Sequence, residues 1–184
     1  MVYMKGKRVA IFIDGSNFYH SIHDTFGMHE NEVDFGKLTE KLKGSRMLIG
    51  VYYYNAPLDR NYNEEVYWKQ QKFFSELRKI PGFNVIMCSL RKRKGPGGKI
   101  EYKMKGDDIH LAVDMVSFAY ENTYDVAIIV SGDGDFVPAL KRCQKLGKKV
   151  ENAYFRISRS DFLRKVCDSS ICLDDIVEDC MREK

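Results

Sequence analysis

Carboxylates follow two of the most apolar segments of the sequence, each at the point where the segment ends. Asp14 closes the run Arg8–Ile13. Asp133 and Asp135 follow the run Val126–Val130, within the stretch Ser-Gly-Asp-Gly-Asp. Short apolar runs of this kind are typical of buried strands in a parallel sheet. Since the carboxyl ends of parallel strands meet at one sheet edge, we expect these carboxylates to converge there. The alternative is that they are ordinary turn residues.

A third acidic element opens the helix predicted over Asp107–Glu121. At about 100° per residue, Asp108 falls in the middle of the apolar face and Asp107 at its border. Because a lone buried carboxylate is costly unless it is paired or metal-bound, we expect Asp108 to point inward to a site. Asp114 falls on a narrow polar face and is expected to be solvated. Capping of the helix is the alternative role for the two leading aspartates.

Carboxylates that converge repel one another, and a hard divalent cation removes that repulsion. Mg²⁺ and Mn²⁺ both prefer oxygen ligands. A cation held by carboxylates with open coordination positions suits phosphoryl chemistry, because it activates water, orients phosphate and neutralises developing charge. The pattern therefore predicts a Mg²⁺ or Mn²⁺ site that acts on phosphate esters.

Three motifs give the chain a resemblance to the NYN domain family, in the LabA-like branch of the PIN-like nuclease superfamily. They are IDGSNFY at 13–19, KGDDIHLAVDM at 105–115 and VSGDGDFVPAL at 130–140. The motifs appear in the family's order and roughly its spacing, and the similar region covers residues 8–155. This resemblance implies a PIN-like α/β fold and a metal-dependent ribonuclease whose products carry a 5′-phosphate and a 3′-hydroxyl.

The resemblance also implies roles for individual residues. Asp14 is the ligand on the first strand, and Asn17 positions that carboxylate or water at the metal. Asp108 is the acid of the helix, and Asp133 and Asp135 complete the set of four metal ligands. A second tier of candidates consists of Asp107, Asp114 and Ser131. The family's pattern also has the later helix aspartate, here Asp114, but it often has an apolar residue where this chain has Asp107, which is either a spare ligand or a cap. The histidines His20 and His23, three residues apart after the first motif, are weaker candidates for a ligand or catalytic role.

A basic stretch precedes the acidic helix and is the predicted RNA contact. Its cations are Arg91, Lys92, Arg93, Lys94 and Lys105. Basic residues along a loop can follow a phosphate backbone. The alternative is a solvated hairpin whose charge only aids solubility. Tyr52, Tyr53 and Tyr54 end a predicted strand at the same edge, where core packing is favoured over stacking on a base.

Alternating strands and helices predict an α/β fold: a three-layer PIN-like sandwich with a mostly parallel central sheet and helices on both faces. The predicted strands are Arg8–Ile13, Met47–Tyr54, Asn84–Leu90, Val126–Val130 and Lys149–Phe155. The predicted helices are Phe35–Lys43, Glu64–Ile80, Asp107–Glu121 and Phe136–Leu146, with a basic Gly-rich turn at Arg91–Lys99. A polar stretch is expected after Asp14. We interpret residues 1–184 as a single domain, with a recognisable core at 8–155 and a C-terminal helical extension at 156–184.

Composition narrows the function classes. The 184 residues carry 30 Lys and Arg against 26 Asp and Glu, and the net charge of +4 permits an anionic partner without requiring one. Five cysteines without a CxxC pair indicate reduced thiols and a cytoplasmic protein. No apolar stretch reaches the length of a signal or membrane segment, so no membrane partner is expected. The absence of a P-loop and of GxGxxG argues against an NTPase or a dinucleotide enzyme.

Hydrolysis of RNA, single-stranded or structured, by a Mg²⁺- or Mn²⁺-dependent enzyme is therefore the favoured function. One alternative is an RNA-binding regulator that keeps the nuclease fold but has little activity. Another is a small-molecule phosphatase, although Ser16 stands where a haloacid-dehalogenase-type phosphatase requires a second aspartate. The oligomeric state is open, and a homodimer is compatible with the sequence.

Overall fold

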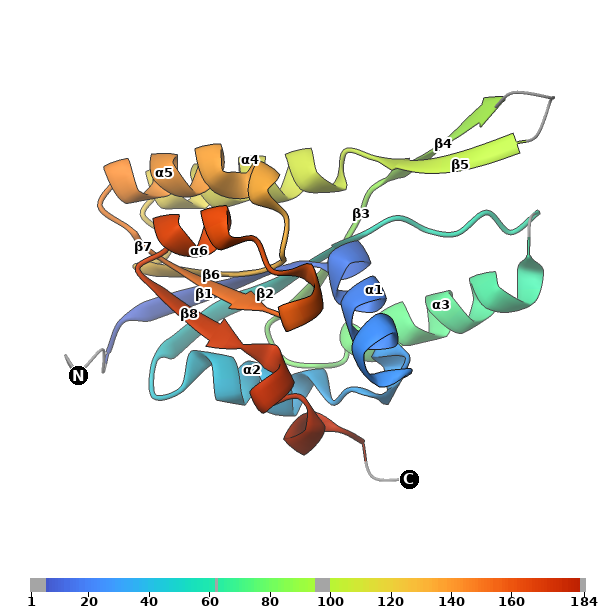
Figure 1. Cartoon of the computed structure of the whole chain (residues 1–184), viewed down its shortest axis with the longest axis horizontal. Helices are drawn as coiled ribbons and strands as arrows, with labels where there is room; N and C mark the ends of the chain where they lie inside the picture. Colours follow the sequence, from blue (N-terminus) through green and yellow to red (C-terminus); the bar gives the residue numbers. More distant parts are fainter. Residues whose placement is uncertain (1–5, 62, 95–99, 183–184) are drawn as a thin grey trace.

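A parallel sheet forms the centre of the molecule (Figure 1). The computed structural model describes residues 6–61, 63–94 and 100–182 of the chain. Within them, six parallel strands lie in the order β3-β2-β1-β6-β7-β8. Their bounds are β1 Arg8–Asp14, β2 Met47–Asn55, β3 Phe83–Met87, β6 Val126–Val130, β7 Lys149–Tyr154 and β8 Ser169–Cys172. The strand order reverses between β1 and β6, and such a switch point is where α/β sheets bind ligands.

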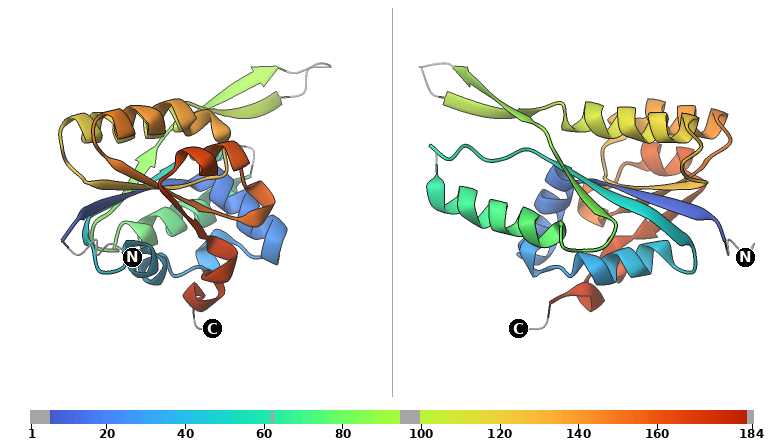
Figure 2. Two further views of the ribbon diagram at one scale, coloured as in Figure 1. Left: turned by 60° about the vertical axis from the view of Figure 1, so that its left-hand side comes forward. Right: turned by 180° about the vertical axis from the view of Figure 1, so that it is seen from behind.

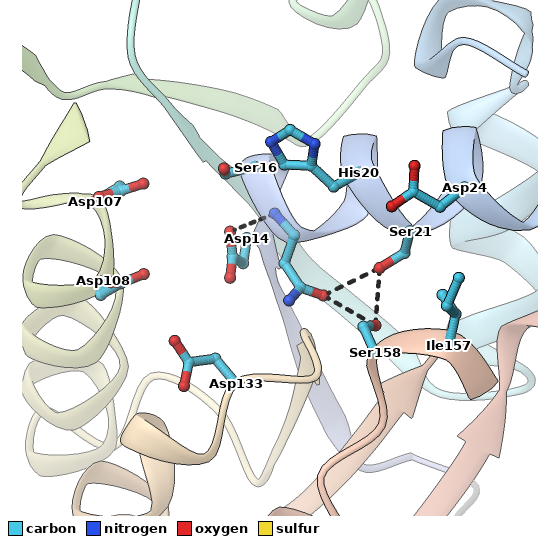
Figure 3. A pocket seen from close by; sticks show the side chains of 11 residues that line it. Asp14, Ser16, His20, Ser21, Asp24, Asp107, Asp108, Asp133, Ile157 and Ser158 are labelled. Carbon is cyan, nitrogen blue, oxygen red and sulfur yellow. Dashed lines mark hydrogen bonds between the residues drawn. The ribbon is translucent and has the colours of Figure 1, made fainter. Parts of the chain in front are cut away.

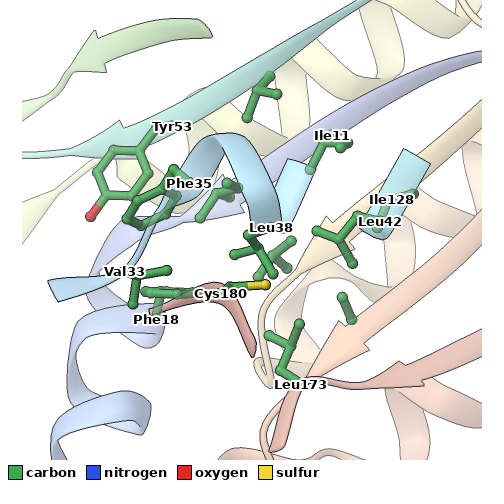
Figure 4. Close-up of a cluster of buried hydrophobic side chains, with 14 of the residues drawn as sticks. Ile11, Phe18, Val33, Phe35, Leu38, Leu42, Tyr53, Ile128, Leu173 and Cys180 are labelled. Carbon is green, nitrogen blue, oxygen red and sulfur yellow. The ribbon is translucent and has the colours of Figure 1, made fainter. Parts of the chain in front are cut away.

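Helices cover both faces of the sheet, which confirms the three-layer α/β prediction (Figure 2). One layer consists of α1 Gly15–Phe26, α2 Phe35–Lys43 and α3 Glu64–Leu77. The other consists of α4 Asp107–Tyr120, α5 Val137–Lys145 and α6 Asp161–Val166. Side chains alternate along β1, so Ile11 packs against the first layer and Phe12 against the second. This double burial is why the strand is apolar throughout (Figure 4 shows the first layer).

Capping explains where two helices of the first layer begin. The Asp34 carboxylate accepts a hydrogen bond from the Lys37 N–H at 3.0 Å and starts α2. The Asn63 side chain does the same for the Val66 N–H at 3.0 Å and starts α3. Both residues belong to the types that satisfy the unpaired amides of a first helical turn.

The polar stretch expected after Asp14 is instead the helix α1, and that prediction was wrong. Asp14 is its N-cap, and Gly15 is its first residue. Among its buried residues only Phe18 and Ile22 are apolar, and this spacing by four was too sparse to reveal a helix.

The third predicted strand is divided in the structure. β3 ends at Met87, and the chain leaves the sheet to form the antiparallel hairpin of β4 Ser89–Lys94 and β5 Ile100–Lys105. Figures 1 and 2 show this hairpin projecting away from the sheet beside the N-terminus of α4. The Gly-containing part of the predicted basic turn, residues 95–99, lies outside the described residues.

The segment after Phe155 is more than the expected helical extension. It adds β8 to the edge of the sheet, because Glu151 to Tyr154 pair in register with Ser169 to Cys172. Its short 3₁₀ turns are η4 Arg156–Ser158, η5 Leu173–Asp175 and η6 Glu178–Cys180. Two other 3₁₀ turns, η1 Glu30–Glu32 and η3 Gly134–Phe136, flank α1 and α5. In the part of the chain that the structure describes, no helix has both the length and the apolar character that crossing a membrane requires.

Candidate active site

A cavity of about 490 Å³ opens at the switch point, beside the carboxyl ends of β1 and β6 (Figure 3). Its lining comprises Asp14, Ser16, Asn17, His20, Ser21, Asp24, Asp107, Asp108, Asp133, Ile157 and Ser158. Four separate elements contribute carboxylates: the end of β1, α1, the N-terminus of α4 and the loop after β6. Figure 3 shows Asp107 and Asp108 on one side of the cavity, with Asp14 and Asp133 facing them.

Asp14 is the most enclosed of these carboxylates, with 6% of its surface exposed. One oxygen accepts a hydrogen bond from the Asn17 N–H at 3.0 Å, and the other accepts one from the Ser131 hydroxyl at 2.9 Å. Burial raises the pKa of Asp14, the two hydrogen bonds oppose this, and the charges of Asp108 and Asp107 add to the rise, so that the pKa is about 6. The carboxylate is therefore held in a fixed orientation at an electrostatic cost.

The loop after β6 brings Asp133 into the cavity lining and leaves Asp135 outside it. The Asp133 carboxylate accepts a hydrogen bond from the Asp135 N–H at 2.8 Å, and the Asp133 N–H donates to the Ser131 hydroxyl at 3.0 Å. Ser131 thus connects Asp14 to this loop. Asp135 is exposed, and its charge raises the pKa of Asp108 from nearby.

Asn17 ties α1 to the same loop. Its Oδ1 accepts a hydrogen bond from the Gly132 N–H at 3.0 Å and lies 3.5 Å and 3.4 Å from the hydroxyls of Ser21 and Ser158. Those two hydroxyls are 2.8 Å apart. Because these donors engage Oδ1, Asn17 can offer a ligand in the cavity only the N–H groups of Nδ2. Such a group donates to a phosphate oxygen or to water and does not coordinate a cation.

The two aspartates that open α4 differ in burial from what the helical geometry predicted. Asp107 is 9% exposed, whereas Asp108 is exposed at the cavity. The expected burial of Asp108 was wrong because the apolar residues Ile109 and Val113, 65% and 55% exposed, lie on the solvent side and misplaced the buried face. Asp108 does line the cavity, as expected. Partial desolvation raises the pKa of Asp108, and the charges of Asp107 and two other aspartates add to it.

Asp114 also departs from the expected solvated position. It is half-buried, and the Tyr54 hydroxyl donates to its Oδ2 at 2.9 Å. Asp114 is not among the residues that line the cavity. The structure therefore joins Asp114 to the end of β2, apart from the carboxylates that line the cavity.

The donor chemistry fits a hard divalent cation, although the carboxylates are not drawn together around one point. Among the described residues, no three His, Cys, Asp or Glu side chains lie close enough to hold one ion. The oxygen donors are nevertheless of the type that Mg²⁺ and Mn²⁺ prefer. The charges of Asp107 and Asp108 raise the pKa of Asp14, and the charge of Asp107 raises that of Asp108. A bound cation would relieve this repulsion.

Residues of α1 and η4 complete the lining, and most of them were not identified from the sequence. Ser16, His20 and Asp24 follow one another at intervals of four, so they share one face of α1. That spacing could have indicated a shared helical face, but only if α1 had been recognised as a helix. Ser158 comes from distant sequence and carried no signal of its own.

The predicted RNA-contact cations belong to the hairpin. Arg91 pairs with Lys103 and Lys92 with Tyr102 along the two strands. Lys105 ends β5, two residues before the first residue of α4. The hairpin therefore leads directly to the cavity, and contact between its cations and RNA stays a prediction.

The backbone at Gly132 lies so close to Ser158 that no residue with a side chain fits at this position. A Cβ at this position would lie 1.7 Å from the Ser158 carbonyl oxygen. Gly132→Ala should therefore displace η4 and destabilise the protein by about 1–3 kcal/mol, the usual range for overpacking. Urea unfolding measures this. Gly134→Ala is the matched control, because its Cβ would meet only the Ser160 hydroxyl at 3.2 Å. Equal stability of the two variants would contradict the close approach.

Comparison with known proteins gives two findings on the chain as a whole. The model of the NYN domain family matches residues 8–174. A Vibrio parahaemolyticus protein of unknown function has a similar solved structure, with a TM-score of 0.71 and 23% sequence identity. That alignment covers 95% of this chain and 98% of the Vibrio chain, and at this identity it shows the fold alone.

The remaining comparisons add little. No curated protein matches the sequence. A structure from Parabacteroides merdae, named as a proposed oxidoreductase, aligns with a TM-score of 0.34 and 14% identity over 88% of this chain and 28% of that one. This similarity is too weak to indicate a shared fold or function.

Proposed function

The chain belongs to the NYN domain family, and from that membership and the cavity we propose that it is a metal-dependent ribonuclease that hydrolyses RNA phosphodiester bonds. One observation carries the proposal most: carboxylates from separate elements meet in a single cavity at the switch point of a PIN-like α/β fold. The products would carry a 5′-phosphate and a 3′-hydroxyl. Assignment to the LabA-like branch and a cytoplasmic location are further parts of this proposal.

Asp14, Asp108 and Asp133 would hold Mg²⁺ or Mn²⁺ once their side chains draw together, because among the described residues no three such side chains surround one point. Asp107 and Asp135 would lie nearby as further acceptors. When bound, the cation supplies activation of water and neutralisation of charge on the phosphate. The chain's own residues set the orientation. Ser131 and the Asn17 N–H direct the two oxygens of Asp14.

Neutral donors on the other wall of the cavity would receive the phosphodiester. The Nδ2 group of Asn17 can donate to a non-bridging phosphate oxygen, since Oδ1 is held by the Gly132 N–H. Ser21 and Ser158 keep that amide in place through their contacts with Oδ1. Fixed donors of this kind stabilise developing charge without reorganising during the reaction.

RNA cleavage in the presence and absence of metal tests the proposal. A labelled single-stranded RNA should be cut with Mn²⁺ or Mg²⁺ and remain intact with EDTA, and the products should be substrates for 5′-phosphate-dependent exonucleolytic digestion. RNA binding in EDTA without cleavage in Mn²⁺ would instead favour a regulator that only binds. Hydrolysis of a chromogenic phosphate ester without RNA cleavage would favour a phosphatase. Gel filtration with light scattering would decide whether the protein is a homodimer.

The hairpin cations should govern the salt dependence of RNA binding. Changing Arg91, Lys92, Arg93 and Lys94 to Ser should reduce the slope of log K against log salt by up to about 3, because about 0.7 counterions are released per phosphate contacted on single-stranded RNA. Fluorescence anisotropy at several salt concentrations measures the slope. A control variant removes four cations elsewhere: Lys37, Lys41, Lys43 and Lys79. If both variants lower the slope equally, the effect reflects net charge and the hairpin is not the contact.

A further inference from the structure

Tyr53 is a fully buried tyrosine whose ring is held in place by its neighbours. It lies among the rings of Phe35, Phe73 and Phe83, with centroid distances of 5.8, 6.0 and 6.4 Å. Figure 4 shows its ring beside Phe35 in the first layer. Its hydroxyl donates a hydrogen bond to Glu30 Oε2 at 2.6 Å. Packing and hydrogen bonding therefore both fix the phenol.

The end of this ring lies against the residue that follows Asp14. A Cβ on Gly15 would be 2.6 Å from Tyr53 Cζ and 2.7 Å from its hydroxyl oxygen. The phenol thus occupies the space that a side chain would need at the first residue of α1. Because Asp14 and Gly15 are adjacent in the chain, the position of the ring limits where the Asp14 carboxylate can lie.

Glu30 is a half-buried carboxylate that the proposed reaction does not use. It opens η1, four residues after the end of α1, so the Tyr53 hydroxyl contacts both the start of α1 and the segment beyond its end. Burial raises the pKa of Glu30 to about 7, which the hydrogen bond from Tyr53 only partly offsets. Phenylalanine would fill the space of Tyr53 without a partly desolvated acid beside it, so packing alone gives no reason for the pair.

We infer that Tyr53 and Glu30 form a positioning pair, which holds the turn of Asp14 and Gly15 in the geometry that the proposed ribonuclease site requires. The inference rests on the proposed function. Neither residue lines the cavity, and both act through Gly15 and α1. Tyr54, the next residue, is on the opposite face of β2, and its hydroxyl donates a hydrogen bond to Asp114 instead.

Three variants of the pair and one matched control test the inference. Tyr53→Phe and Glu30→Ala should each lower kcat for RNA cleavage about tenfold and leave KM within about twofold, which corresponds to about 1.4 kcal/mol in the transition state. Glu30→Gln should restore nearly full kcat, since its amide oxygen still accepts the Tyr53 hydroxyl. The control is Tyr124→Phe, which removes an equally buried hydroxyl that donates to the Met115 carbonyl at 2.7 Å.

A second readout uses metal-free protein in EDTA and needs no activity. The Asn17 N–H donates to Asp14 Oδ1, so its hydrogen exchange reports where that carboxylate lies. NMR should show about fivefold faster exchange at Asn17, and a shifted Gly15 Hα resonance, in Tyr53→Phe but not in Tyr124→Phe.

The outcomes separate this inference from the function itself. If the wild-type protein fails to cleave RNA, the proposed function fails, and the exchange measurement still decides whether the pair positions Asp14. Wild-type exchange and kcat in Tyr53→Phe would overturn the inference. So would losses of the same size in Tyr53→Phe, Glu30→Gln and Tyr124→Phe, because these would reflect reduced stability alone.

Discussion

Replacing Asp14 with Asn is expected to lower RNA cleavage about 100- to 1000-fold while the protein stays folded. Loss of one group that stabilises charge in the transition state commonly has an effect of this size. Asp14 is the most enclosed carboxylate of the cavity. Asn retains an oxygen that can accept the Asn17 N–H, and Asn is as good an N-cap as Asp. The change therefore removes charge and keeps the start of α1.

Asp34→Asn is the matched control for this prediction. Asp34 is also a helix N-cap, accepts an N–H at the same distance of 3.0 Å, and lies outside the cavity. Single-turnover cleavage at saturating Mn²⁺ should be unchanged in Asp34→Asn. Asp133→Asn should be impaired like Asp14→Asn, since it also lines the cavity. Wild-type rates for Asp14→Asn would exclude this cavity as the place of catalysis.

The carboxylates that follow strands were predictable from sequence because the strands themselves are. β1 and β6 are short, apolar and buried on both faces, and such runs carry a strong local signal. A parallel sheet then brings their ends together without further information. Helical periodicity, which is also a local pattern, located the helix that carries Asp107 and Asp108.

Features that depend on neighbours in space were not predictable. Which of Asp107 and Asp108 is buried depends on how α4 sits on the sheet, and the exposed apolar residues Ile109 and Val113 concealed this. α1 is a helix largely because Asp14 caps it and Phe18 and Ile22 find partners in other elements. The contact of Gly132 with Ser158 joins segments far apart in the chain, so no local pattern reveals it.

The burial of the Asp14 carboxylate also destabilises the metal-free protein, and this destabilisation depends on pH. The pKa of Asp14 rises from 3.8 to about 6 on folding. Between these values the folded state binds more protons than the unfolded state, so the free energy of unfolding falls as pH rises. The fall should begin near pH 4, end near pH 6 and amount to about 3 kcal/mol for a shift of about two units.

Asp14→Asn should therefore stabilise the protein in EDTA at pH 7, although it strongly lowers cleavage in Mn²⁺. The weakened contact with the Ser131 hydroxyl costs about 1 kcal/mol. The net gain is then about 2 kcal/mol, or about 4–8 °C in melting temperature for a chain of this size. Mn²⁺ should reverse the order, because an ion that binds only the folded state adds about 2.7 kcal/mol at a hundredfold excess over its dissociation constant. The variant, which lacks a ligand, should gain less.

Thermal melts separate the effect of the raised Asp14 pKa from the effect of metal binding. They compare the wild type, Asp14→Asn and Asp34→Asn at pH 5, 6 and 7, with EDTA and with Mn²⁺. Asp34→Asn keeps a cap of the same geometry outside the cavity, so it should follow the wild type in both series. A wild-type melting temperature in EDTA that rises from pH 5 to pH 7, with no advantage for Asp14→Asn, would mean that the Asp14 carboxylate is not strained. Equal shifts with Mn²⁺ in all three proteins would mean that Asp14 does not bind the ion. Because one substitution is expected to raise the stability of the metal-free protein and to lower its activity with metal, a simple loss of folding cannot imitate the result.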